Sequence, residues 1–368
     1  YGMRPARWNA SVFVMLPYAL YRYFGDRQTM ERYWRSILWY MEYQKTKLTP
    51  AGLVGGYFVG EWCPPMKDSI LEDHQSAFPR EISNQLMTSC FYYMDCMLCV
   101  SMAELLGDAG AAREFRERMR QMREAINRPF FDAEAGCYLP RCQGNQILPL
   151  AFGIVPDGAL ARVGAALTDC IIRKDHYHIS TGSHATRFLF QVLGELGAED
   201  LAIRMLSETG YPSFGYMLEN GATALWERWE KNLGFMTSHD HPMTGGFGVW
   251  FFSALGGIQP GADRLRIAPT VPHSLKEVHC KRQFRTGTVM SGWHKVGQEL
   301  HFEFRIPWNL PTEILLPRLG CDIGDLTVNG EPAAQCGRVA DTPEGFRMEV
   351  GMGYWHMVLR RTTGAEAF

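Results

Sequence analysis

The chain has 368 residues, 46% of them hydrophobic and 21% charged, which predicts a folded protein with more than one core and excludes a disordered chain. The formal net charge is −2 without any basic run, which excludes nucleic acid and anionic lipid as main partners. No apolar run reaches the roughly 18 residues of a membrane span, so no membrane-spanning helix is predicted. Aromatic residues make up 12%, which fits either a large core or a cleft that binds sugar rings.

The first part of the chain, from about residue 11 to residue 209, has the apolar periodicity of helices. Three short corners are predicted where one helix ends at a glycine and the next begins, at Gly25, Gly107 and Gly197, and Asp26 is placed to cap the helix after the first corner. Short corners make antiparallel helix pairs, and such pairs recurring along a chain build a helical toroid.

The segments between the helix pairs, residues 48–69, 130–146 and 171–182, are rich in Gly, Pro and aromatic residues. Loops of this length in a compact domain usually carry function, so we expect them to face one mouth of the toroid. The first of these loops contains Glu61 and Trp62, and the stretch "ARWNAS", which is predicted to open a helix, contains Trp8.

The ten cysteines do not form a disulfide framework, because Cys90, Cys96 and Cys99 lie in an apolar helical run and are expected to be buried thiols. Cys137 and Cys142 are spaced for a disulfide or for metal binding, but no second pair accompanies them. We therefore predict no metal site and a reducing, cytoplasmic compartment. No glycine-rich phosphate loop or dinucleotide fingerprint occurs, so no organic cofactor is predicted either.

After about Pro260 the pattern changes to short alternating segments separated by Gly, Pro and Asn turns, which is typical of an all-β sandwich. The predicted fold is therefore mainly α: an (α/α)6 toroid over residues 1–262, followed by a β-sandwich over residues 263–368. Only eight or nine helices are predicted before the sandwich, and a closed toroid of six pairs needs twelve. We expect the N-terminal part of the toroid to be missing from this chain.

The segment from Gly210 to Gly246 has the densest grouping of aromatic, acidic and imidazole side chains. Within it, Trp226 and Trp229 flank Glu227, and apolar surface beside a carboxylate can tune it as a general base. The alternative is a surface glutamate paired with Arg228, and Glu219 and Glu230 are expected to belong to the scaffold.

The stretch "SHDHP" follows with His239, Asp240 and His241. Two histidines at this spacing can bind metal, but no third ligand is obvious, so hydrogen bonding to substrate hydroxyls is the preferred hypothesis. A purely structural role stays open, and it is the preferred one for His176 and His178 in the similar "KDHYHISTG".

Taken together, "YPSFGYMLENGATALWERWE" and "GFMTSHDHPMTGGFGVWFFSALGGIQP" resemble the inverting α-L-rhamnosidases of glycoside hydrolase family 78. The similarity extends upstream through "HISTGSHATRFLFQVLGELG", "GEWCPP" and "ARWNASVFVMLPYALYRYFGD", and so covers most of residues 1–262. The tryptophan–glutamate–arginine–tryptophan block is the specific part of the resemblance, because similar helices occur in many families.

The resemblance implies roles for particular residues. Glu227 matches the general base that activates water, His241 matches a histidine that contacts the sugar, and Trp8 and Trp62 match tryptophans that line the rhamnose subsite. Glu61, Trp226 and His239 complete the predicted substrate-binding set. The chain departs from the family pattern at Asn9, Glu61 and Asp240, and it lacks the upstream DxxRxE motif that carries the general acid.

The resemblance predicts hydrolysis of terminal α-L-rhamnosides by inversion, with the general acid on a segment absent from this chain. The implied partner is a carbohydrate, and neither metal nor cofactor is needed because water and two carboxyl groups suffice. Two alternatives remain open: a non-catalytic sugar-binding homologue, and a glycosidase of the same fold that acts on another sugar.

Overall fold

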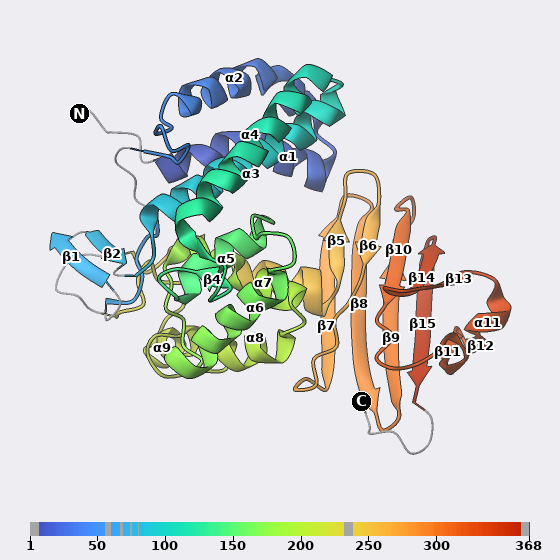
Figure 1. Cartoon of the computed structure of the whole chain (residues 1–368). Helices are drawn as coiled ribbons and strands as arrows, with labels where there is room; N and C mark the ends of the chain where they lie inside the picture. The colour runs from blue at the N-terminus through green and yellow to red at the C-terminus, as the bar shows by residue number, and fades with distance from the viewer. Residues whose placement is uncertain are drawn as a thin grey trace. The chain divides into compact units, whose positions relative to one another are not determined.

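The computed structural model describes residues 7–55, 60–66, 69–73, 76–79, 81–231, 238–361 and 368, and it divides into two compact units, Tyr1–Phe247 and Gly248–Phe368. The first unit is mainly helical and the second is built from strands (Figure 1). The predicted fold class, a helical region followed by a β-rich domain, is therefore confirmed.

The helical unit is built from helix pairs with a few two-stranded ladders between them. Its elements are α1 (Arg7–Phe24), α2 (Arg27–Lys45), β1 (Ser69–Asp73), β2 (Ser76–Pro79), α3 (Asn84–Leu106), α4 (Ala109–Phe130), β3 (Phe131–Asp132), β4 (Cys137–Tyr138), α5 (Gln143–Ala151), α6 (Leu160–Asp169), the π-helix η2 (Cys170–Lys174), α7 (Ser183–Glu195), α8 (Glu199–Leu206), α9 (Phe214–Glu219) and the 3-10 turn η3 (Pro242–Thr244).

The three predicted corners are present. Gly25, Gly107 and Gly197 have φ of 69°, 78° and 69°, a left-handed conformation that glycine adopts without steric cost. Asp26 caps α2 by accepting the backbone N–H of Thr29, as predicted. The chain therefore reverses direction within two or three residues at each corner, and α3 and α4 lie side by side (Figure 1).

α3 is the central helix of this unit. It is long and apolar enough to cross a membrane by length and composition, but 78% of its most apolar window is buried within the protein. Its apolar character is explained by this burial on nearly all sides, and Cys90, Cys96 and Cys99 on it are buried free thiols, as predicted. Cys137 and Cys142 are also free.

The second unit begins within α10 (Gly246–Trp250) and the π-helix η4 (Phe251–Leu255), and its strands form two sheets. One sheet has the order β13 (Val339–Thr342), β14 (Gly345–Val350), β10 (Thr312–Leu316), β6 (Leu265–Ile267), β5 (Ile258–Pro260). The other has the order β12 (Glu331–Pro332), β11 (Leu326–Val328), β15 (Gly353–Arg360), β9 (Glu299–Ile306), β8 (Gly287–Val296), β7 (Glu277–Phe284). A short 3-10 turn, η5 (Ile323–Asp325), and the helix α11 (Ala333–Cys336) lie between strands.

One hydrophobic core joins the two sheets of this unit. Ile314 and Phe346 from the first sheet belong to the same buried cluster as Trp293, Phe302 and Phe304 from the second, which is the arrangement of a sandwich. Alternation of buried and exposed positions along β9 places Phe302 and Phe304 inward. β5 belongs to this sandwich but lies before residue 263, where the sequence predicted the sandwich to begin. A strand of three residues is too short to show alternation in the sequence.

Candidate active site

Glu227 lies in an irregular segment that follows α9. The hydroxyl of Ser213 caps α9 by accepting the N–H of Tyr216, and the helix is followed by Gly221 at a φ of 86°. The chain then runs through the aromatic block without regular secondary structure, with Trp226 and Trp229 buried and Glu227 half-buried between them. The two buried indoles therefore anchor the block, while Glu227 stays partly open to solvent.

Both carboxylate oxygens of Glu227 accept hydrogen bonds. The indole Nε1 of Trp62 donates to Oε1 at 3.2 Å, and the backbone N–H of Ser238 donates to Oε2 at 3.2 Å. The backbone N–H of Glu227 donates in turn to the carbonyl of Ser238 at 3.0 Å. A distant loop, through Trp62, and a nearby one, through Ser238, thus meet at the carboxylate of Glu227, and the resemblance had assigned two of these residues, Glu227 and Trp62, to the site.

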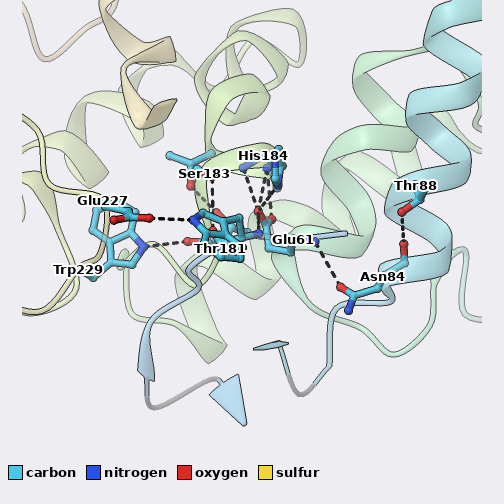
Figure 2. A network of polar contacts seen from close by, with 11 residues as sticks. Glu61, Asn84, Thr88, Thr181, Ser183, His184, Glu227 and Trp229 are labelled. Carbon is cyan, nitrogen blue, oxygen red and sulfur yellow. Dashed lines mark hydrogen bonds and ion pairs between the residues drawn. The ribbon is translucent and has the colours of Figure 1, made fainter. Parts of the chain in front are cut away.

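A second indole, that of Trp229, fixes the aromatic block around Glu227. Trp229 Nε1 donates to the carbonyl of Thr181 at 2.9 Å, and its ring packs edge-on against Phe214 with centroids 5.3 Å apart. Thr181 lies in the loop that leads into α7, so this hydrogen bond joins the aromatic block to that loop (Figure 2).

Glu61 is fully buried, with 0% of its surface exposed. Its carboxylate accepts the backbone N–H groups of Trp62 at 3.1 Å, His184 at 2.9 Å and Ala185 at 3.2 Å (Figure 2). Burial raises the pKa of this carboxyl to about 7, against the opposing effect of these backbone N–H groups. The sequence placed Glu61 among the substrate contacts, but the structure buries its side chain against the N-terminus of α7.

The imidazole of His184 also approaches this carboxylate, with Nδ1 at 3.8 Å from Glu61 Oε1. Burial lowers the pKa of His184 to about 4, so the ring is neutral at pH 7 and the contact is not an ion pair. The backbone N–H groups at the helix N-terminus, and not His184, are therefore what favours the ionised form of Glu61 against the larger effect of burial.

The predicted histidines lie beside the same block. The ring of His239 stacks on Trp226 with centroids 4.7 Å apart and an interplanar angle of 21°, and His239 is exposed. The backbone N–H of His241 donates to the carbonyl of Leu225 at 2.8 Å, and its ring Nδ1 is buried without a hydrogen-bond partner in the described part of the chain. Asp240 is exposed.

The structure thus brings six of the seven predicted site residues to one region: Glu61, Trp62, Trp226, Glu227, His239 and His241. Trp8 falls in α1, but its side chain lies outside the described residues. Within the described ranges, no group of three His, Cys, Asp or Glu side chains is placed to hold a metal ion.

Two further groups lie at the site, of which the sequence singled out only Glu230, as a scaffold residue. Ser238 contacts Glu227 only through its backbone, which no side-chain pattern could indicate. Glu230 accepts hydrogen bonds from the hydroxyl of Tyr211 and, at 2.8 Å, from the backbone N–H of Met66, so it ties the loop after Trp62 to the segment before α9. The scaffold role that the sequence suggested for Glu230 agrees with these contacts.

Comparison with known proteins identifies relatives of both units. Residues 2–255 match the family described as bacterial alpha-L-rhamnosidase 6 hairpin glycosidase domain, and residues 255–326 match the bacterial alpha-L-rhamnosidase C-terminal domain. An alpha-L-rhamnosidase of Formosa agariphila is 25% identical over 336 residues, which is 88% of this chain and 34% of that protein. One from Streptomyces avermitilis is 27% identical over 83% of this chain and 29% of that protein.

Solved structures give the same result for the fold. The alpha-L-rhamnosidase from Dictyoglumus thermophilum superposes with a TM-score of 0.86 at 27% identity, over 96% of this chain and 39% of that one. The Streptomyces avermitilis alpha-L-rhamnosidase complexed with L-rhamnose superposes with a TM-score of 0.81 at 22% identity, over 95% of this chain and 33% of that one. The chain spans about a third of the length of the relatives it matches.

Proposed function

The chain belongs to the family of bacterial α-L-rhamnosidases with a six-hairpin glycosidase domain, and on this premise we propose that it supplies the general base for hydrolysis of terminal α-L-rhamnosides with inversion. Glu227 is the base. It removes a proton from a water molecule as that water attacks the anomeric carbon, and the bond to the leaving oxygen breaks in the same step.

The environment of Glu227 is the observation that supports this role. The carboxylate is half-buried, and the indole of Trp62 and the backbone of Ser238 each direct an N–H at one of its oxygens. Such fixed donors hold a carboxylate in one orientation, which is what a base needs in order to meet a single water molecule.

Inversion needs a second carboxyl group about 6.5–9.5 Å from the first, with a proton to donate. Among the described neighbours, Glu61 is buried under α7 and Glu230 is bonded to Tyr211 and Met66, so neither is placed for this task. In this proposal the general acid belongs to a segment outside the 368 residues.

The sugar contacts follow from the side chains around Glu227. Trp62 offers indole surface, His239 and His241 offer ring nitrogens, and the remaining predicted wall is Trp8. Trp226, predicted as a further sugar contact, is 3% exposed and instead supports His239 by stacking under its ring. Flat rings suit the apolar face of a 6-deoxy sugar, and imidazole nitrogens suit its hydroxyl groups. The relative from Streptomyces avermitilis was solved in complex with L-rhamnose, which supports this ligand class.

Replacing Glu227 with Gln in the full-length protein tests the proposal. We expect kcat on an aryl α-L-rhamnoside to fall by about 10²–10⁴-fold, while L-rhamnose still binds, because only the proton-accepting function is removed. Glu219→Gln is the matched control, since Glu219 is an exposed glutamate at the end of α9 in the same segment, and this variant should keep full activity.

Normal turnover in E227Q would exclude Glu227 as the base. The stereochemistry gives a second reading, because inversion predicts that the β-anomer of L-rhamnose is released first, before mutarotation, and a first-formed α-anomer would exclude the mechanism. Binding of L-rhamnose without turnover by the full-length wild-type protein would instead favour a non-catalytic sugar-binding homologue, and a panel of aryl glycosides distinguishes rhamnose from other sugars.

A further inference from the structure

α7 begins without a cap of its own. Its N-cap residue is Gly182, which has no side chain to accept the free N–H groups of the first turn. Glu61, more than a hundred residues earlier in the chain, fills this role: its carboxylate accepts the N–H groups of His184 and Ala185. A carboxylate at this point also complements the positive end of the helix dipole.

The same carboxylate fixes the residue that follows it. The backbone N–H of Trp62 donates to Glu61 Oε1, and the carbonyl of Trp62 accepts the N–H of Ser183 at 2.8 Å. The backbones are so close that a Cβ atom on Gly182 would lie 1.9 Å from the carbonyl oxygen of Trp62. Both peptide groups of Trp62 are therefore held against the N-terminus of α7.

The side chain of Trp62 then reaches the carboxylate of Glu227, with Nε1 3.2 Å from Oε1. Trp62 alone therefore connects the buried carboxylate of Glu61 to the proposed base. Its backbone N–H is bonded to Glu61, and its indole N–H is bonded to Glu227 (Figure 2).

We propose that Glu61 is a positioning residue: by capping α7 it holds the indole of Trp62 where its N–H orients the carboxylate of Glu227. The catalytic consequence rests on the proposed function, but the structural coupling does not. The competing explanation is that Glu61 only stabilises α7 and that Trp62 keeps its place without it.

The indole N–H of Trp62 reports directly on this coupling. In the full chain labelled with ¹⁵N-tryptophan, Trp62→Phe identifies the Trp62 Nε1–H signal by its loss, and Glu227→Gln identifies the shift caused by changing its acceptor. Glu61→Leu then removes both acceptor oxygens at a similar side-chain volume. We expect the Trp62 signal to shift or broaden at least as much in E61L as in E227Q.

The matched control is Asp108→Asn. Asp108 also caps a helix, α4, and also accepts an indole N–H, that of Trp34 at 3.1 Å. This variant should move the Trp34 signal and leave the Trp62 signal unchanged. If E61L does not fold, Glu61→Gln, which retains one acceptor oxygen, is measured instead. An unmoved Trp62 signal in whichever of these variants is folded overturns the proposal.

Kinetics on the full-length protein give an independent reading. Misplacing a catalytic group by about 1 Å can cost on the order of 100-fold in rate, so we expect kcat of E61L to fall by about 10- to 100-fold with KM within about 3-fold of wild type. The E61L/W62F double variant should be no slower than W62F alone, because both changes act through one indole. Unchanged kcat in an active, folded E61L protein would overturn the proposal, while an inactive wild-type protein would contradict only the proposed function and leave the indole measurement valid.

Discussion

Glu61 and Asp95 are the most deeply buried acidic side chains among the described residues, and they are stabilised differently. Glu61 accepts three backbone N–H groups, so each of its oxygens has a partner. Asp95, on α3, accepts only the hydroxyl of Ser11 at 3.0 Å, and its Oδ1 is buried without a hydrogen-bond partner in the described part of the chain. Burial raises the pKa of Asp95 to about 8.

The raised pKa of Asp95 predicts a pH-dependent stability. Because the folded state holds this proton up to about pH 8 and the unfolded state releases it near pH 4, the free energy of unfolding should fall as pH rises through this interval. One proton corresponds to about 1.4 kcal/mol per pH unit. We expect Asp95→Asn to remove this contribution, as measured by urea unfolding at a series of pH values between 5 and 8.

Ser11→Ala is a useful companion variant for this measurement, since it removes the hydrogen bond but keeps the titrating group. It should retain the pH dependence that D95N loses. Identical pH profiles for wild type and D95N would show that Asp95 is charged in the folded protein at neutral pH.

At the scale of elements, helix starts depend on capping side chains that come either from the preceding residue or from far away. Asp108 caps α4 locally by accepting the N–H of Ala111 at 3.0 Å, and this hydrogen bond is the main reason that its pKa is lowered. α7 uses Glu61 from another loop. A local cap is visible in the sequence, whereas a cap from a distant loop is visible only in the structure.

The local cap can be tested by comparing Asp108→Ala with Asp108→Asn. Loss of a capping side chain costs about 0.5–2 kcal/mol, and asparagine caps about as well as aspartate. We expect D108A to lower the free energy of unfolding by about this amount and D108N to stay close to wild type, as followed by far-UV circular dichroism in urea. An equal loss in both variants would assign the effect to the charge and not to the cap.

The strands of the second unit differ in how well alternation predicted them. β7, β8 and β9 have eight to ten residues each, which is long enough for alternation to show in the sequence. β5, β12 and β13 have two to four residues, and such short strands owe their extended conformation to pairing with a neighbour.

At the scale of the whole molecule, the two compact units have separate cores. The sandwich has its own cluster of buried side chains, including Phe302 at 0% exposure, which packs between the two sheets. A destabilising substitution within this cluster should therefore lower the local stability of residues 248–361 before that of the helical unit.

Phe302→Ala tests this separation. Removing a buried phenylalanine side chain costs about 3–5 kcal/mol, so hydrogen exchange should accelerate across the strands of residues 248–361 and remain close to wild type in α3 and α4. Val296→Ala, at a position on β8 that is 55% exposed, is the control and should change neither region. Equal acceleration in both units of F302A would mean that they unfold together.

Local chemistry in the sequence was sufficient to predict the helix corners, the cap at Asp26, the buried thiols of α3 and the change from helices to strands, because glycine conformations, caps and alternation act over a few residues. Resemblance to a family supplied Glu227 and Trp62 as neighbours in one site. Only the tertiary structure decided that Ser238 contacts Glu227 through its backbone and that Glu61 is buried as the cap of α7. The first is a backbone contact that no side-chain pattern indicates, and the second joins Glu61 to a helix more than a hundred residues away, so its geometry depends on how the helices pack.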